Sequence, residues 1–282
     1  MPEAVARRRR RPAGRINLFL WLGATLLAAF AVLAVLGERV APYDPTTQDL
    51  FAMLEGPTAA HLFGTDNVGR DILSRIIVGT RFTLSIALAS MFFAGIGGIA
   101  LGSIAGYFGG GTDRVVTGLI DPLLTVPNIV LAIAIAAAAG SSATGLTIAI
   151  TASFIPPLAR LVRGRVIELR EEDFIAAAIT VGMGHTRILL RHILPNAATV
   201  IIIELSLNAG QAVLIGSALG FLGLGVQPPA PEWGTMLGAS REYLTVAPHL
   251  VIAPGIAISL LVLAFNAFGD GLRDVFDPAS RN

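Results

Sequence analysis

The chain alternates long apolar runs with short polar segments. Six runs of about 20 residues or more contain at most one charged side chain each, and they occupy residues 17–36, 82–108, 115–140, 143–161, 197–223 and 250–269. An α-helix of that length crosses the roughly 30 Å hydrocarbon core of a bilayer, where every backbone polar group must be satisfied within the protein. The pattern therefore predicts an all-α integral membrane protein with six transmembrane helices.

A polar stretch separates the first predicted transmembrane helix, residues 17–37, from the second. It covers residues 38–81, and Pro42, Pro45 and Pro57 interrupt regular structure within it. We expect this stretch to leave the membrane as an extracytoplasmic excursion.

The end of that excursion, residues 70–81, has the pattern of a short amphipathic helix of its own. Asp71 and Arg75 stand four residues apart on its polar face, a spacing that allows an ion pair.

Arginine placement predicts the orientation. Residues 1–16 form an Arg-rich tail, and a second group of arginines lies in the loop 160–196. Because positive charge near span ends favours the cytoplasm, both segments are predicted to be cytoplasmic, and residues 271–282 form a second cytoplasmic tail. Residues 82–270 then carry the other five spans, with an outer loop at 223–249 in which Trp233 and Tyr243 suit the membrane interface.

Composition agrees with a membrane protein and excludes some chemistry. The chain of 282 residues is 54% hydrophobic and 14% charged, and it contains no cysteine. All 20 basic residues are arginine, so the lysine of a Walker-type phosphate loop is missing. His61 and His249 are each interpreted as isolated from other plausible metal ligands. We therefore expect no ATPase site, no metal, no cofactor in this chain and no nucleic-acid partner.

The loop 160–196 predicts a helical hairpin. Glu171, Glu172 and Asp173 precede a short apolar segment that ends at Gly182, and acidic residues are favourable in a first helical turn. A second helix is expected over residues 185–194, stopped by Pro195. Such a hairpin could dock into a groove of another protein, or it could be an inert interfacial loop.

Three polar residues inside the predicted spans are candidates for a solute pathway. Asp121 lies beside Pro122 and Pro127, which predict a kink near the inner end of the third span. Glu204 lies about two turns into the fifth span, with Asn208 one turn further on. A structural hydrogen bond between Glu204 and Asn208 is the alternative interpretation.

The hairpin resembles the EAA loop of ABC-importer permeases. That resemblance implies a coupling helix that docks into a cleft of a separate ATPase. The residues implied are Glu172, Asp173, Phe174, Ala176, Ala177, Ala178, Gly182, Ile193, Leu194 and Pro195. Ala176 stands where the family has an acidic residue, and the acids just before it are possible substitutes.

The resemblance covers about residues 40–278. The stretches HLFGTDNVGRDILSRIIVGTRFTLSIAL, LARLVRGRVIELREEDF, RHILPN, FLGLGVQPPAPEWGTML and LAFNAFGDGLRDVFDP look like the dipeptide, oligopeptide and nickel importer permeases of the DppC and OppC type. The family implies a type I ABC-importer permease fold in a bacterial inner membrane, with a re-entrant outer loop and both termini cytoplasmic.

The same resemblance implies the partners and the power source. The expected partners are a homologous second permease, two ATPase subunits that bind ATP and Mg, an extracytoplasmic solute-binding protein and the lipid bilayer. Dipeptides or oligopeptides are the expected solutes, with nickel or another small solute as the alternative. An ion-coupled secondary carrier and a membrane scaffold or receptor are two further hypotheses of other classes.

Overall fold

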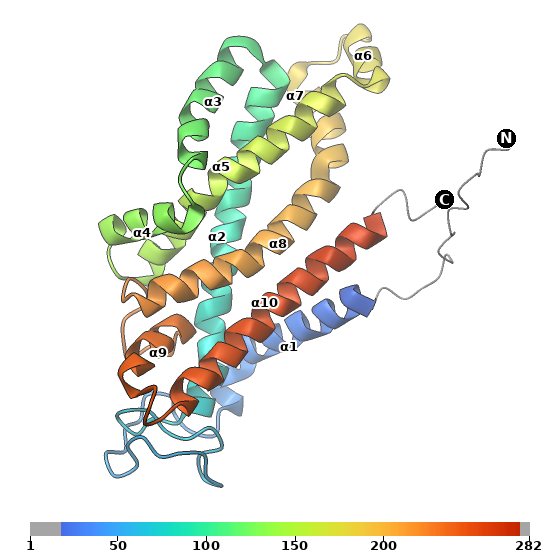
Figure 1. Cartoon of the computed structure of the whole chain (residues 1–282). Coiled ribbons are helices and arrows are strands. Elements are labelled where there is room, and N and C mark those ends of the chain that lie inside the picture. Colours follow the sequence, from blue (N-terminus) through green and yellow to red (C-terminus); the bar gives the residue numbers. More distant parts are fainter. Residues whose placement is uncertain (1–17, 277–282) are drawn as a thin grey trace, which may run out of the picture.

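The computed structural model describes residues 18–276, and every long element in this part of the chain is a helix (Figure 1). The predicted Arg-rich tail, residues 1–16, lies outside the described residues. The helices are α1 (Leu18–Val40), α2 (Ile72–Phe108), α3 (Gly110–Leu124), α4 (Asn128–Ala139), α5 (Ala143–Arg170), α6 (Asp173–Thr180), α7 (His185–Ile188), a π-helical turn η1 (Leu189–Ile193), α8 (Leu194–Phe221), α9 (Trp233–Ser240), a 3₁₀ turn η2 (Arg241–Tyr243) and α10 (His249–Phe276).

Five of the described helical segments are long and apolar enough to cross a membrane. They are α1, α2, α5, the continuous segment from α7 to α8, and α10. The sixth predicted span is a broken one, because α3 and α4 meet at 94°. Pro122 lies inside α3, and Pro127 immediately precedes α4, so this region breaks more completely than the predicted kink.

Four predicted helix boundaries were wrong. Residues 271–276, predicted to begin the second tail, belong to α10, and the rest of that predicted tail, residues 277–282, lies outside the described residues. The segment 70–81 is not a separate helix, because α2 runs without interruption from Ile72 to Phe108. The fourth span does not end at residue 161, because α5 continues to Arg170. The helix that begins at His185 does not stop at Pro195: it passes through η1 into α8. Pro195 lies in the first turn of α8, where a proline needs no backbone donor, and the preceding π-helical turn accommodates it.

The predicted pair of Asp71 and Arg75 does not form. Asp71 instead caps the start of α2, where its carboxylate accepts hydrogen bonds from the Ser74 amide at 2.7 Å and the Ser74 hydroxyl at 2.6 Å. Its other oxygen lies 2.9 Å from Nδ1 of His61, so His61 is not isolated as the sequence suggested. Capping gives a hydrogen-bond acceptor to a backbone N–H at the helix start. An ion pair with Arg75 would leave that N–H without an acceptor.

The helices form a bundle with two distinct ends (Figure 1). One end carries α6, α7 and the connection from α2 to α3, and we call it the hairpin end. The opposite end carries residues 41–71 and α9, and we call it the loop end. An extensive apolar core at the loop end joins α2, α5, α8, α9 and α10, and Trp233 is fully buried in it. The prediction that Trp233 lies at the membrane interface was therefore wrong.

Helices α2 and α5 form the most extensive contact among the described helices. Gly98, Gly102 and Gly106 line the face of α2 that meets α5, four residues apart. A Cβ built on Gly102 would overlap the carbonyl oxygen of Ala159 and lie 2.8 Å from Cβ of Val162. The absence of side chains on this face lets the two backbones approach, as small residues do in other membrane bundles.

Replacing Gly102 with alanine should destabilise the protein, because neither the Ala159 carbonyl nor the α5 backbone can move without shifting the whole helix. We expect a loss of roughly 1–3 kcal/mol, typical of overpacking. The matched control is Gly164→Ala in α5, where an added Cβ meets nothing within 4 Å. Thermal unfolding of both purified variants in detergent measures the difference; equal melting temperatures would contradict the packing described.

Candidate functional site

The predicted hairpin forms between α5 and α8. Helix α6 ends in a Schellman motif, in which the Gly182 amide donates to the Ile179 carbonyl at 2.9 Å and the Met183 amide donates to the Ala178 carbonyl at 3.1 Å. Gly182 has a φ of +79°, the left-handed conformation that this motif needs and that glycine adopts without strain. The sequence signal at Gly182 therefore corresponds to a sharp turn that sets α6 at an angle to the next helix.

Helix α6 has an inward and an outward face. Ile175 is 0% exposed and Ala178 is buried, whereas Phe174, Ala176 and Ala177 are exposed. The outward face continues with Ile179, which is 53% exposed, and with Val181 after the helix, which is 84% exposed. The sequence analysis did not single out Ile179 and Val181. Ile179 lies four residues after Ile175, so helical periodicity alone would have placed it near the inward face.

The inward face packs onto three long helices. The cluster beneath the hairpin contains Tyr107 of α2, Leu158, Val162, Val166 and Leu169 of α5, Ile175 and Ala178 of α6, Ile188 of α7, Ile193 of η1, and Ala197 and Ile201 of α8. Ile193 is fully buried, so of the residues predicted to couple, Ile193 and Ala178 support the hairpin from below. The hairpin is thus part of the bundle's packing and not a loose loop.

Two polar contacts fasten the hairpin end further. The Tyr107 hydroxyl lies 2.9 Å from Nδ1 of His185 at the start of α7. Nη1 of Arg170, the last residue of α5, donates to the carbonyl oxygen of Tyr107 at 3.0 Å. These contacts join the end of α2 to the end of α5 and to the second arm of the hairpin.

The acidic residues at the start of α6 face solvent. Glu171, Glu172 and Asp173 are all exposed, and within residues 18–276 none of them forms an ion pair. Glu172 occupies the N-cap position without a side-chain capping bond. Leu194 is partly buried and Pro195 is exposed beside the same end of the bundle. The outer surface of the hairpin therefore combines an apolar patch with free carboxylates.

The three pathway candidates do not form one site. Asp121 pairs with Arg160 across α3 and α5, with 2.8 Å between Oδ1 and Nη2, and Asp113 pairs with Arg163 on the same two helices at 2.6 Å. Asn208 donates to Glu204 at 3.3 Å, the structural hydrogen bond that the sequence left as an alternative. No hydrogen bond or ion pair among the described residues joins Asp121 to Glu204 or Asn208.

Glu232 is a buried acid that the sequence analysis did not recognise as a candidate. It caps α9, because its carboxylate accepts from the Gly234 and Thr235 amides, each at 2.8 Å. Burial raises the pKa of this carboxyl, and the hydrogen bonds from Gly234 and Thr235 oppose that rise. The only sequence signal for Glu232 was a proline-rich stretch followed by Glu-Trp-Gly. That signal indicated a turn, but it did not indicate that the Glu232 side chain is buried.

Substituting Ile175 and Ile179 one at a time tests the two faces of α6. Ile175→Ala should loosen the hairpin, because it removes a fully buried side chain, a change that typically costs about 2–5 kcal/mol in a core. Ile179→Ala should leave the hairpin intact. Hydrogen exchange of amides 173–194 is the measurement: faster exchange in Ile179→Ala than in Ile175→Ala would refute the assigned faces.

Comparisons with known proteins agree with this geometry. Residues 98–282 match the family model described as "Binding-protein-dependent transport system inner membrane component". The chain is 43% identical over 266 residues to the dipeptide transport system permease protein DppC of Alkalihalophilus pseudofirmus, covering 94% of this chain and 88% of that protein. It is 42% identical over 254 residues to the glutathione transport system permease protein GsiD of Pectobacterium atrosepticum, covering 90% of this chain and 83% of that protein.

A solved structure shares the fold. The chain superimposes on the MetNI methionine ABC transporter, in an inward-facing conformation, with a TM-score of 0.61 and 18% sequence identity, covering 73% of this chain and 98% of that one. The fold is therefore that of a type I ABC-importer permease. Together with the sequence matches, this places the chain in the family of binding-protein-dependent transport system inner membrane components.

Proposed function

We propose that this permease subunit forms half of the solute pathway of a peptide importer and transmits ATP-driven motion through its hairpin. The observation that carries the proposal is the hairpin itself. It presents exposed apolar side chains at the tip, and it is packed below onto α2, α5 and α8. Relatives that act on dipeptides and on glutathione support a small peptide as the solute.

The proposed partners follow from the family and from the shape of the hairpin. A homologous permease completes the pathway, and two ATPase subunits, which bind ATP and Mg, receive the hairpins in their clefts. A solute-binding protein delivers the solute at the loop end. Chemistry on ATP belongs to the partner subunits, since this chain has no lysine for a Walker-type phosphate loop.

The proposed orientation places the hairpin end in the cytoplasm. Arginines of the loop 160–196 gather at this end, on α5 and on the arm formed by α7 and η1. Positive charge at the ends of spans favours the cytoplasmic side, and both termini are then cytoplasmic in a six-span chain. The loop end, with residues 41–71 and α9, faces outward.

The proposed coupling mechanism is a rigid displacement. When the ATPases close, they move the hairpin tip, and the packing beneath it leaves no flexible joint between α6 and the long helices. The motion therefore reaches α2, α5 and α8 together and alternates the access of the pathway. Among the predicted coupling residues, Phe174, Ala176 and Ala177 contact the ATPase, with Glu172 and Asp173 beside them, while Ala178, Ile193 and Leu194 support the hairpin.

The ion-coupled carrier is the weaker hypothesis. It needs intramembrane acids that can exchange ions, and the two candidates already have partners, Asp121 with Arg160 and Glu204 with Asn208. Glu204 and Asn208 remain our proposed polar residues of the pathway wall.

Val181→Asp should separate the permease from its ATPases, because it places a charge at the most exposed apolar position of the hairpin. We expect ATPase co-purification to fall at least tenfold and ATP-dependent peptide uptake into proteoliposomes to be lost. The control is Val246→Asp, the same change at a residue 75% exposed near the loop end. Retained co-purification in Val181→Asp, or equal loss in both variants, would exclude docking through the hairpin tip.

Gly182→Val tests whether the angle of the turn matters for coupling. A Cβ at Gly182 meets nothing within 4 Å, so the cost comes from the positive φ and amounts to about 1–2 kcal/mol. Gly184→Val is the control, since Gly184 is equally open but has an ordinary φ of −67°. We expect binding-protein-stimulated ATP hydrolysis to fall several-fold in Gly182→Val only, and unchanged stimulation there would count against the role of the turn.

A further inference from the structure

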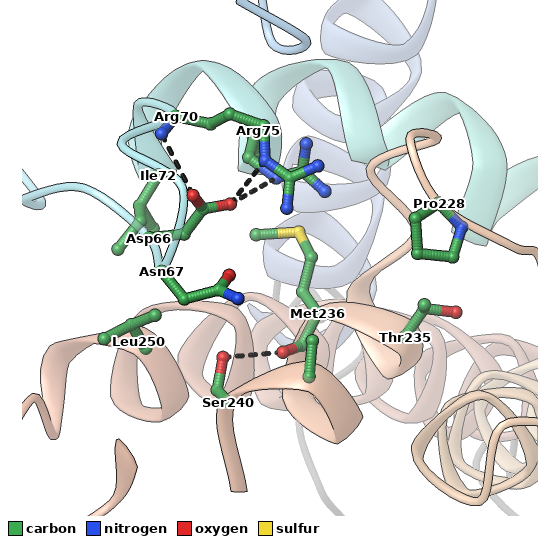
Figure 2. Close-up of a pocket in the computed structure, with 11 residues that line it drawn as sticks. Asp66, Asn67, Arg70, Ile72, Arg75, Pro228, Thr235, Met236, Ser240 and Leu250 are labelled. Atoms are coloured by element: carbon green, nitrogen blue, oxygen red, sulfur yellow. Dashed lines mark hydrogen bonds and ion pairs between the residues drawn. The ribbon is translucent and has the colours of Figure 1, made fainter. Parts of the chain in front are cut away.

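The loop end holds a buried cluster with two arginines and one carboxylate (Figure 2). Arg75 of α2 is 4% exposed, Arg70 is 9% exposed and Asp66 is 7% exposed. Oδ2 of Asp66 accepts from Nε of Arg70 at 2.6 Å and lies 3.7 Å from Nε of Arg75. One carboxylate is therefore shared between two buried guanidinium groups, and it is closely bonded to only one of them.

Among the described residues, no second acid lines the space beside this cluster. The carboxylate of Asp71, although close in sequence, is directed to Ser74 and His61. Both hydrogen bonds that the Arg75 side chain donates within residues 18–276 start from Nη1, to the carbonyl oxygens of Pro45 at 2.8 Å and of Pro229 at 3.4 Å. Carbonyl dipoles reduce the cost of a buried cation but do not neutralise it.

A small cavity adjoins this cluster. Its volume is about 30 Å³, and Asp66 is the only acid among its lining residues, against Arg70 and Arg75. Across the cavity lie Met236 and Ser240 of α9, and the side chain of Asn67 also borders it, as Figure 2 shows. Within residues 18–276 the Asn67 side chain forms no hydrogen bond, so its N–H groups are available to an acceptor.

We propose that this cavity binds one small monovalent anion such as chloride. The formal charge of the lining residues is +1, which one such ion balances. A volume near that of one or two water molecules admits a halide and excludes a peptide or a larger oxyanion. Arg75 and Arg70 supply the charge, and the Asn67 amide supplies a neutral donor.

The ion would join separate parts of the loop end. Arg75 already contacts Pro45 in the segment 41–71 and Pro229 in the segment that leads into α9. An anion beside it neutralises the charge at the point where these segments meet α2. Bound anion therefore stabilises the folded loop end, by the general linkage between ligand binding and stability.

The test is the thermal stability of the full-length protein, purified in detergent with the subunits that co-purify with it. Chloride and bromide should raise the melting temperature by a few degrees in a saturable way, relative to sodium gluconate at the same ionic strength. Sulfate at matched ionic strength stabilises by exclusion from the protein surface and should give no saturable shift. An equal saturable shift with sulfate, or no shift with chloride, would overturn the proposal.

Asn67→Asp provides the discriminating variant, because it places a fixed carboxylate in the cavity. It should abolish the chloride response and melt in gluconate near the temperature of the unaltered protein in chloride. Asn196→Asp, the same change at an exposed position of the hairpin end, should keep the response. A full chloride response in Asn67→Asp would refute the site.

Should Asn67→Asp fail to fold, anomalous diffraction from bromide-soaked crystals of the unaltered protein decides the question. A peak between Arg75 and Asn67 is expected, and its absence would reject the proposal.

Discussion

The close approach of α2 and α5 is the contact on which the rest of the structure depends. A bilayer supplies little hydrophobic force between helices, so the two can associate strongly only by backbone proximity. The glycine face of α2 provides that proximity over several turns. Because α5 carries the hairpin at its end and α2 begins within the loop end, this one contact aligns the two functional ends of the chain.

The hairpin end and the loop end are both ordered by contacts to the long helices, but through different side chains. At the hairpin end, aliphatic side chains fill the space beneath α6, and Tyr107 with Arg170 fixes the edges. At the loop end, capping carboxylates do the positioning: Asp71 begins α2 and Glu232 begins α9. Each end is thereby ordered by contacts to the long helices, so displacement of one element requires displacement of its neighbours.

Local signals in the sequence predicted much of this arrangement. The lengths of the apolar runs predicted the spans. Gly182 predicted the turn of the hairpin, because the left-handed backbone conformation at the end of a helix depends on the local residue type. The errors arose where distant contacts decide. Pro195 was predicted to stop a helix but lies in the first turn of α8. Trp233 was predicted at the interface but is buried in a core between α2, α8 and α10.

The site could be predicted only in part for the same reason. The sequence placed the coupling residues on one hairpin, but it could not say that Ile193 and Ala178 face inward while Ile179 and Val181 face outward, since that depends on where α5 and α8 lie. Asp71 and Arg75 had suitable spacing for an ion pair, but the Asp71 carboxylate instead accepts a hydrogen bond from a backbone amide at the start of α2. The carbonyl groups of Pro45 and Pro229 that contact Arg75 come from segments far from it in sequence and had no local signal.

The break between α3 and α4 has a consequence for how the chain meets its surroundings. Counted as one span, these helices place non-helical backbone around Thr125 and Pro127 within the bilayer, and this region is largely exposed in the isolated chain. Lipid cannot hydrogen-bond the carbonyl groups that such a break frees. The exposed side of the break must therefore be covered by protein or wetted, which distinguishes it from the faces of α1 and α2 that can contact lipid tails.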